Sequence, residues 1–178
     1  TSYSRGLNGV FIDIEGAPYD LTADDFEFRI GNSHNPSGWV IAPAPMQVLA
    51  RPGAGLNGSQ RVMIVWPDGV IQNIWLQVRV KSTVNTALKL DDLFYFGNLI
   101  GDAGHNWAVP VVNAMDQIAT RNQSLMTSVP ITHAADFNRD TILNSSDEWE
   151  SSRNQGKSLV RLLAPPATTE LEPKLPKD

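Results

Sequence analysis

Residues Asp136 to Asp147 read DFNRDTILNSSD and place oxygen-bearing side chains at the first, third, fifth, ninth and twelfth positions of the stretch. This is the spacing of a calcium loop, because Ca²⁺ takes roughly six to eight oxygen ligands and a tightly curled backbone points alternate early side chains inward. The sequence therefore predicts one Ca²⁺ site here. The expected ligands are the side chains of Asp136, Asn138, Asp140, Asn144 and Asp147 and the backbone carbonyl of Ile142.

This stretch departs from the usual calcium loop at two positions. Thr141 stands at the sixth position, where glycine is usual, so it must take the sharp turn at a conformational cost. Asp147 stands at the twelfth position, where glutamate is usual, so closure of the site depends on a shorter side chain. The alternative is a polar turn whose Asp and Asn side chains cap their own backbone. We favour calcium, because a turn needs only one or two such residues.

An internal repeat supports a second, related unit upstream. The segment NAMDQIATRNQ, from Asn113 to Gln123, parallels NSSDEWESSRNQ, from Asn144 to Gln155. Both begin with Asn-x-x-Asp, continue with a helical-looking run and end with Arg-Asn-Gln, and the equivalent residues at their starts lie 31 positions apart. Duplicated loop–helix units are the simplest interpretation.

The loop of the first unit cannot have the ordinary form. Counting back from Asp116 puts Pro110 at the sixth position, and proline cannot take a positive φ. The span from 102 to 116 can instead be read as the standard loop with three residues inserted. Its candidate ligands are Asp102, Asn106, Asn113 and Asp116, with the backbone carbonyl of Val111. The alternative is a distorted loop that packs without metal, and the sequence leaves both open.

On these residues the chain resembles a type I dockerin, the paired calcium-loop and helix module of cellulosomal enzymes, and more narrowly its divergent forms in large secreted planctomycete proteins. The likeness rests on FYFGNLIGDAG (94–104), VVNAMD (111–116) and DFNRDTILNSSD, and covers roughly residues 91–163. It implies two calcium-bound loop–helix units and a cohesin-like protein partner. The positions that would contact this partner are Ala114, Met115, Ser145 and Ser146, which differ between the two copies.

The first ninety residues show the period-two alternation of half-buried strands, separated by segments rich in glycine and proline. RVMIVW (61–66) is apolar on both faces, which predicts a central strand. Stretches such as YSRGLNGVFIDIEG also resemble the module that precedes the repeat in the planctomycete proteins. This second resemblance implies no activity. The side chains expected to point inward are Val10, Ile12, Ile14, Phe26, Phe28, Ile30, Ile74, Leu76, Val78 and Val80.

These patterns predict a mainly β protein with a small α module. An antiparallel β-sandwich of jelly-roll or immunoglobulin-like type is expected over residues 1–90, a dockerin-like pair of calcium loop–helix units over 91–163, and a Pro-rich tail or linker over 164–178. Residues 1–90 hold seven acidic and seven basic side chains, whereas 91–163 hold nine and five. The acidity therefore lies with the loops, which suits divalent cations and gives no support to nucleic-acid binding.

Several classes of protein are excluded or disfavoured by what the sequence lacks. It has no cysteine, which excludes disulfides and thiolate chemistry, and no run of about twenty apolar residues that would span a membrane. His34, His105 and His133 lack the close spacing of a helical zinc site, so we expect no enzyme. A start at Thr1 without a signal peptide is compatible with a processed product or a fragment.

The expected function is that of a non-catalytic, extracellular, calcium-binding interaction or assembly module of a larger secreted protein, either polysaccharide-degrading or cell-surface. One alternative is a carbohydrate-binding module, in which an outward Trp75 and calcium would bind a glycan. Packing of Trp75 under a loop or against the second module is favoured over exposure, because tryptophan is highly buried on average. Another alternative is a self-assembling surface protein joined by exposed strand edges. Trp149 is expected to anchor its helix against the first repeat.

Overall fold

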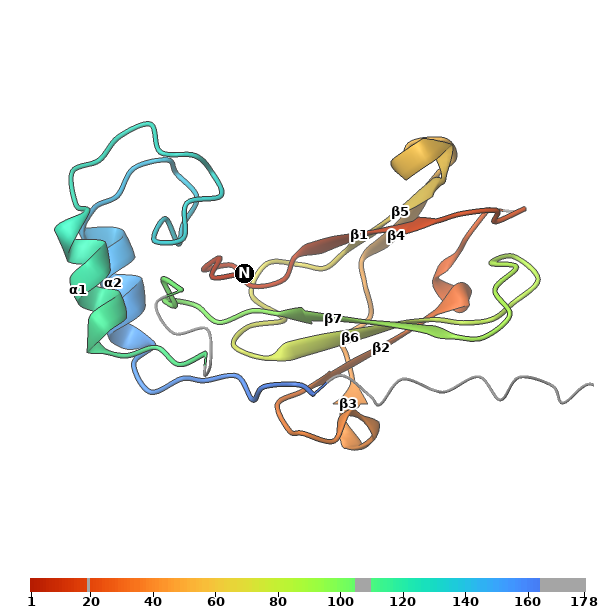
Figure 1. The fold of residues 1–178 in the computed structure, drawn as a ribbon, viewed down its shortest axis with the longest axis horizontal. Coiled ribbons are helices and arrows are strands. Elements are labelled where there is room, and N and C mark those ends of the chain that lie inside the picture. Colours follow the sequence, from red (N-terminus) through yellow and green to blue (C-terminus); the bar gives the residue numbers. More distant parts are fainter. Residues whose placement is uncertain (19, 105–109, 164–178) are drawn as a thin grey trace, which may run out of the picture.

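The computed structural model describes residues 1–18, 20–104 and 110–163. In these residues two antiparallel sheets are followed by two α-helices (Figure 1). The three-stranded sheet has the order β1 (Gly9–Ile14), β5 (Gln60–Val65), β4 (Gln47–Arg51). The four-stranded sheet has the order β3 (Val40–Ile41), β2 (Phe26–Gly31), β6 (Trp75–Val80), β7 (Asp92–Gly97). Short 3₁₀ helices lie at Ala23–Asp25, Pro36–Gly38 and Leu56–Gly58.

One hydrophobic core lies between the two sheets, to which each sheet contributes the apolar face of its strands. The residues predicted to point inward are buried, except for Ile30 and Ile74, which are half-buried. Strand β5 is central in its sheet, as its apolar character on both faces predicted. Trp66 fills the middle of the core, where its ring meets Phe28 edge-to-face with the centroids 5.2 Å apart.

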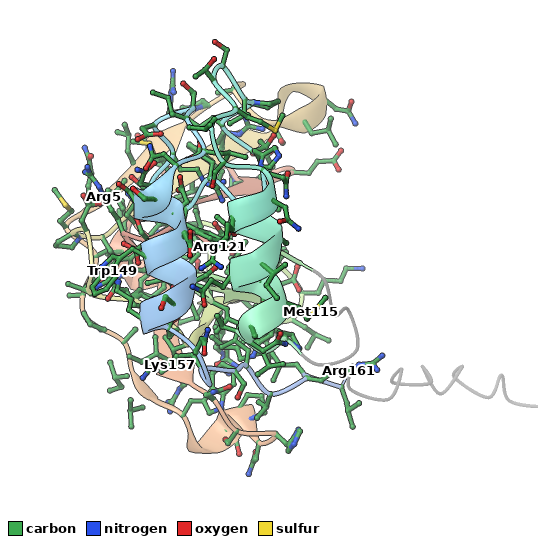
Figure 2. The ribbon with its side chains drawn as sticks, turned by 90° about the vertical axis from the view of Figure 1, so that its left-hand side faces the viewer. Arg5, Met115, Arg121, Trp149, Lys157 and Arg161 are labelled. Carbon is green, nitrogen blue, oxygen red and sulfur yellow. The ribbon has the colours of Figure 1, made fainter. Side chains whose placement is uncertain are left out.

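The helices α1 (Ala114–Asn122) and α2 (Ser145–Arg153) lie side by side at one end of the sheets (Figures 1 and 2). Each begins with a capping box, in which an asparagine bonds the first turn and an aspartate three residues later bonds back. The pairs are Asn113 with Asp116 and Asn144 with Asp147. The internal repeat seen in the sequence therefore has the same local structure in both copies.

Many hydrogen bonds cross the predicted boundary near residue 90. Strand β7 pairs with β6 inside the four-stranded sheet, although it belongs to the predicted second module. The amide of Ser4 donates to the carbonyl of Phe137 at 2.7 Å, and the side-chain amide of Asn32 donates to the carbonyl of Ser158 at 2.8 Å. The two parts are thus tied together from both ends of the chain.

The predicted fold class is wrong in its second part. The two antiparallel sheets are compatible with the β-rich half of that prediction, but the dockerin-like pair of calcium loop–helix units is not found. Within the described ranges, no three His, Cys, Asp or Glu side chains gather into a group that could hold a metal ion. The physical reason is that most of the loop carboxylates accept hydrogen bonds from nearby backbone amides instead of converging on one point. No described helix is long and apolar enough to cross a membrane.

Candidate functional site

The loop from 136 to 147 is curled by two residues with left-handed backbone. Arg139 has a φ of 62° and Thr141 a φ of 68°. Thr141 is the residue at the position where calcium loops usually carry glycine, so the sharp turn expected there is made by a threonine at a steric cost. Leu143, which follows this turn, is fully buried and holds the loop against its own small hydrophobic cluster.

Asp136 is the least satisfied polar residue of this loop. Its side chain is fully buried, and its Oδ2 accepts a hydrogen bond of 2.9 Å from the amide of Thr141. Its Oδ1 is also buried and has no hydrogen-bond partner. A buried carboxylate oxygen without a partner is costly, because it has lost its water and gained no donor. Asp136 therefore presents an acceptor that a cation could satisfy.

Asp147 closes the loop and is fully buried as well. Its Oδ1 accepts from the amide of Phe137 at 2.9 Å and its Oδ2 from the amide of Asn144 at 3.1 Å. Burial raises the pKa of the Asp147 carboxyl and the negative charge of Asp136 acts in the same direction, although the backbone hydrogen bonds oppose both. The two carboxylates thus lie close enough to repel each other.

The other predicted ligands of this loop bond locally. Asp140 accepts from the amide of Ile142 at 2.8 Å through Oδ1 and from the side-chain amide of Asn138 at 2.9 Å through Oδ2. The side-chain oxygen of Asn138 accepts from the amide of Asp140, and that of Asn144 from the amide of Ser146. The self-capped turn that the sequence allowed as an alternative therefore accounts for these three side chains, but not for Asp136.

Among its described residues, the first loop shows no buried acceptor comparable to Oδ1 of Asp136. Both oxygens of Asp116 accept from backbone amides, those of Ala103 and Asn113, each at 2.9 Å. Asp102 Oδ1 accepts from the amide of Gly104 at 2.8 Å. Asn113 caps α1, and Val111 forms an isolated bridge with Ser158. Asn106, the remaining predicted ligand, lies outside the described residues.

The chemistry of the 136–147 loop fits a single hard cation better than a catalytic centre. It offers two neighbouring buried carboxylates, one of them with an unpartnered oxygen, and uncharged amide and carbonyl oxygens around them. Oxygen donors of this kind are those that Ca²⁺ prefers. Binding there would require the local bonds of Asp140 and Asn138 to open.

Trp75 packs against the C-terminal segment rather than standing free. Its indole nitrogen donates to the carbonyl of Val160 at 2.9 Å, and its half-buried ring packs against a cluster formed by Leu99, Val112 and Leu159. This was the favoured of the two sequence interpretations. It removes the open stacking surface on which the carbohydrate-binding alternative depended.

The outer face of the helix pair exposes large apolar side chains (Figure 2). Met115 and Trp149 are 58% and 65% exposed, and Ile118 is 45% exposed. The prediction that Trp149 anchors α2 against the first repeat is therefore wrong. The two helices are joined instead by polar contacts, in which Arg121 and Gln117 of α1 both bond the carboxylate of Glu148.

Two buried polar networks were not identified from the sequence. Asp25 accepts from the Thr83 hydroxyl at 2.7 Å, and Asn98 accepts from the amide of Asn73 at 2.9 Å through its side-chain oxygen. Thr22-x-x-Asp25 is a capping-box signal that sequence reasoning could have used. A lone asparagine such as Asn98 carries no such signal.

Comparison with known proteins gives no further guide to this site, since no family model, curated protein or solved structure matches the chain.

Proposed function

We propose that this chain is a non-catalytic interaction module of an extracellular protein, stabilised by one calcium ion in the loop from 136 to 147. The observation that carries the proposal is the buried, unpartnered Oδ1 of Asp136 beside the carboxylate of Asp147. The residues that would hold the ion are those predicted from the sequence: Asp136, Asn138, Asp140, Asn144 and Asp147, with the carbonyl of Ile142. The proposal concerns one ion and not a pair of calcium units.

Electrostatics supports a cation at this place. Two buried carboxylates near each other destabilise the folded state, because each loses hydration and repels the other. A divalent cation offsets both effects, and it stabilises the fold because it binds only the folded state. This would supply the stabilisation that a small extracellular module without cysteine needs.

The expected affinity suits an extracellular location. Thr141 holds a left-handed backbone at a cost that glycine would not have, and Asp147 reaches less far than glutamate. Both features weaken calcium binding toward the range of extracellular modules, which have a Kd of about 10⁻⁴–10⁻³ M. Calcium would then order the loop only where its concentration is high.

The surface of the helix pair supports a protein as the partner. Met115 and Trp149 expose apolar side chains on adjacent helices, as Figure 2 shows, and such side chains are enriched in protein interfaces. The positions Ala114, Ser145 and Ser146, which the dockerin resemblance predicts to contact a cohesin-like partner, are exposed too. That this partner is a cohesin-like protein stays a prediction.

Titration calorimetry with Ca²⁺ on chelator-treated protein tests the proposal, with thermal unfolding in parallel. We expect one site per chain. At a Ca²⁺ concentration about 100 times the Kd, the free energy of unfolding should rise by about 2.7 kcal/mol. Asp136→Asn should abolish the calcium heat and the calcium-dependent stabilisation.

The variants also separate loss of the site from loss of the fold. Asp136→Asn should unfold without calcium at the same or a higher temperature than wild type, because the amide removes a buried charge and can donate a hydrogen bond. Asp102→Asn, the matched change in the first loop, should leave calcium binding intact. Absence of any calcium heat in the wild type, with a melting temperature that calcium does not change, would reject the proposal.

A further inference from the structure

The two sheets have four outer edges in the described structure, and three of them are protected against pairing with another strand. Strand β3 has only two residues. Strand β4 lies between Pro45 and Pro52. In β7 the amide of Leu93 donates to the adjacent Asp92 carboxylate at 2.8 Å, and the carbonyl of Gly97 accepts from the nitrogen of Thr1 at 2.7 Å.

The fourth edge, β1, has none of these protections. It is six residues long, contains no proline and pairs only with β5 among the described strands. The amide of Trp66 donates to the carbonyl of Asn8, so the alternation of antiparallel pairs assigns the β5-facing bonds to Val10, Ile12 and Ile14. The backbone amides and carbonyls of residues 9, 11 and 13 therefore face away from the sheet.

These outward groups border a groove between β1 and β7, the two strands that flank the same open side of the sheets (Figure 1). Two hollows follow each other along it, with volumes of about 560 and 230 Å³. The first lies between residues 9–11 and 95–97, and the second between residues 12–15 and 92–94. Phe94 and Phe96 are half-buried beneath this opening, so its floor is apolar.

The shape and chemistry of the groove determine what can occupy it. A row of backbone donors and acceptors is satisfied by an extended strand, whose alternate side chains would enter the apolar floor. A second copy of β1 cannot do this, because its own Val10, Ile12 and Ile14 are already buried in its core. The occupant must therefore be a strand with one free apolar face.

Charge adds a second requirement at the far end of the groove. Asp13 is paired with Arg61 at 2.7 Å, but the side chains of Glu15 and Asp92 are exposed at the same end. A strand running antiparallel to β1 would bring its first residues to these carboxylates. Basic residues at its start would be favoured there.

We propose that the groove between β1 and β7 is a strand-acceptor site for an extended segment of another protein, which has apolar residues at every second position and Lys or Arg at its start. The segment pairs with β1 in the antiparallel direction and adds a fourth strand to the three-stranded sheet. Its apolar face covers Phe94 and Phe96. This site is separate from the calcium loop.

A fluorescently labelled peptide, acetyl-KKVTVTVTV-amide, is the probe, and fluorescence anisotropy measures its binding. The peptide with N-methylated threonine amides keeps the side chains but cannot pair with β1, because the solvent-facing threonines lie opposite residues 9, 11 and 13, and it should not bind. Phe11→Pro removes an outward amide without removing a bond to β5, and should weaken binding about tenfold. Phe11→Ala keeps this amide and should bind within about threefold of wild type.

Hydrogen exchange on the wild-type protein provides the independent measurement, and needs no variant to fold. The amides of residues 9, 11 and 13 should exchange rapidly in the free protein and become protected when the peptide is bound. Circular dichroism of Phe11→Pro shows whether the variant is folded. If it is, its weaker binding results from the missing outward amide of β1 and not from unfolding. Failure of the alternating peptide to bind, equal binding of its N-methylated form, or protection confined to other strands would overturn the proposal.

Discussion

The side-chain amide of Asn73 donates a hydrogen bond of 3.1 Å to the side-chain oxygen of Asn154, and so joins the turn before β6 to the end of α2. Asn73 makes two further hydrogen bonds. Its Oδ1 accepts from the amide of Ile100 at 2.8 Å, and its backbone amide donates to the fully buried side chain of Asn98. One residue thus couples the sheets, the segment after β7 and the helix pair.

The first prediction concerns this coupling. Asn154→Ala should lower the free energy of unfolding by about 1–2 kcal/mol, because it removes the bond and leaves the half-buried side-chain amide of Asn73 without that acceptor. Chemical denaturation, followed by tryptophan fluorescence and by circular dichroism, measures the loss. The control is Asn122→Ala, the asparagine of the other Arg-Asn-Gln segment, which lies at the last residue of α1 and is exposed, and it should change stability by less than about 0.5 kcal/mol. Equal effects of the two variants would contradict the assigned role.

The second prediction concerns the contact between Gly101 and α2. Gly101 has a φ of +87°, and a Cβ there would lie 2.8 Å from Cα of Ser151. Gly101→Ala should therefore cost about 3 kcal/mol, the sum of left-handed backbone strain and a clash with backbone. Gly104 has a φ of +80° but nothing within 4 Å of the added Cβ, so Gly104→Ala should cost only about 1 kcal/mol. Denaturant unfolding of both variants measures the difference.

A difference near zero between the two glycine variants would mean that the segment around 101 moves away from α2 without cost. The comparison is sharp because both variants carry the same backbone strain. Only the contacts with the α2 backbone at Glu150 and Ser151 differ. The hydroxyl of Ser151 also donates to the carbonyl of Gly101 at 2.8 Å, so a hydrogen bond holds this segment against α2.

Strands β1, β2 and β6 were predictable from the sequence, because a half-buried strand requires apolar side chains at every second position; β7, which was assigned to the second module, was not predicted. Val10, Ile12 and Ile14 alternate with Phe11, Asp13 and Glu15, and a shift of one position would expose all three. The two Asn-x-x-Asp segments were interpreted as the ends of calcium loops, although this pattern also has a fixed relation to the start of a helix, and in the structure both form capping boxes. The strand pattern has one stable solution and can be read without the fold, whereas this pattern has two.

The metal-binding group was less predictable than the strands, because the same side chains can either bind a cation or accept hydrogen bonds from their own backbone. Asp140 at ligand spacing can bind a cation or the amide of Ile142, and it takes the second. Sequence spacing cannot separate these outcomes. Trp149 was misplaced for a related reason: α2 contains no other apolar residue that would define a buried face, so burial of this one could not be inferred. The prediction of a dockerin-like pair of units was wrong because it depended on side chains such as Asp140, whose alternative contacts the sequence does not distinguish.

The third prediction concerns Asp25, which is 2% exposed. Burial works against its ionised form, but hydrogen bonds from Thr22, Thr83 and Asn85 outweigh it and hold the pKa of the Asp25 carboxyl below its usual range. Asp25→Ala should lower the free energy of unfolding by about 3 kcal/mol, because several donors lose a charged acceptor. Asp24→Ala, the exposed neighbour, should stay within about 0.5 kcal/mol of wild type. Thermal and urea unfolding of the two variants check this contrast, which similar losses would contradict.

The last prediction concerns the pH dependence that Asp13 confers. Hydrogen bonds from Arg61 and from the backbone amide of Leu56 lower the pKa of the Asp13 carboxyl to about 2. Since the folded pKa lies below the usual value, the ionised form stabilises the fold above about pH 4, and this contribution is lost as the pH falls toward 2.

Melting temperatures of wild type and Asp13→Asn between pH 5 and 2 measure this contribution. The wild type should lose its advantage over the variant steadily across this range. Arg61→Gln removes the principal partner and should reduce the pH dependence in the same direction, and added salt should weaken it in the wild type, because the pair is partly exposed. Parallel pH profiles for wild type and Asp13→Asn would show that the Asp13–Arg61 pair contributes nothing to stability.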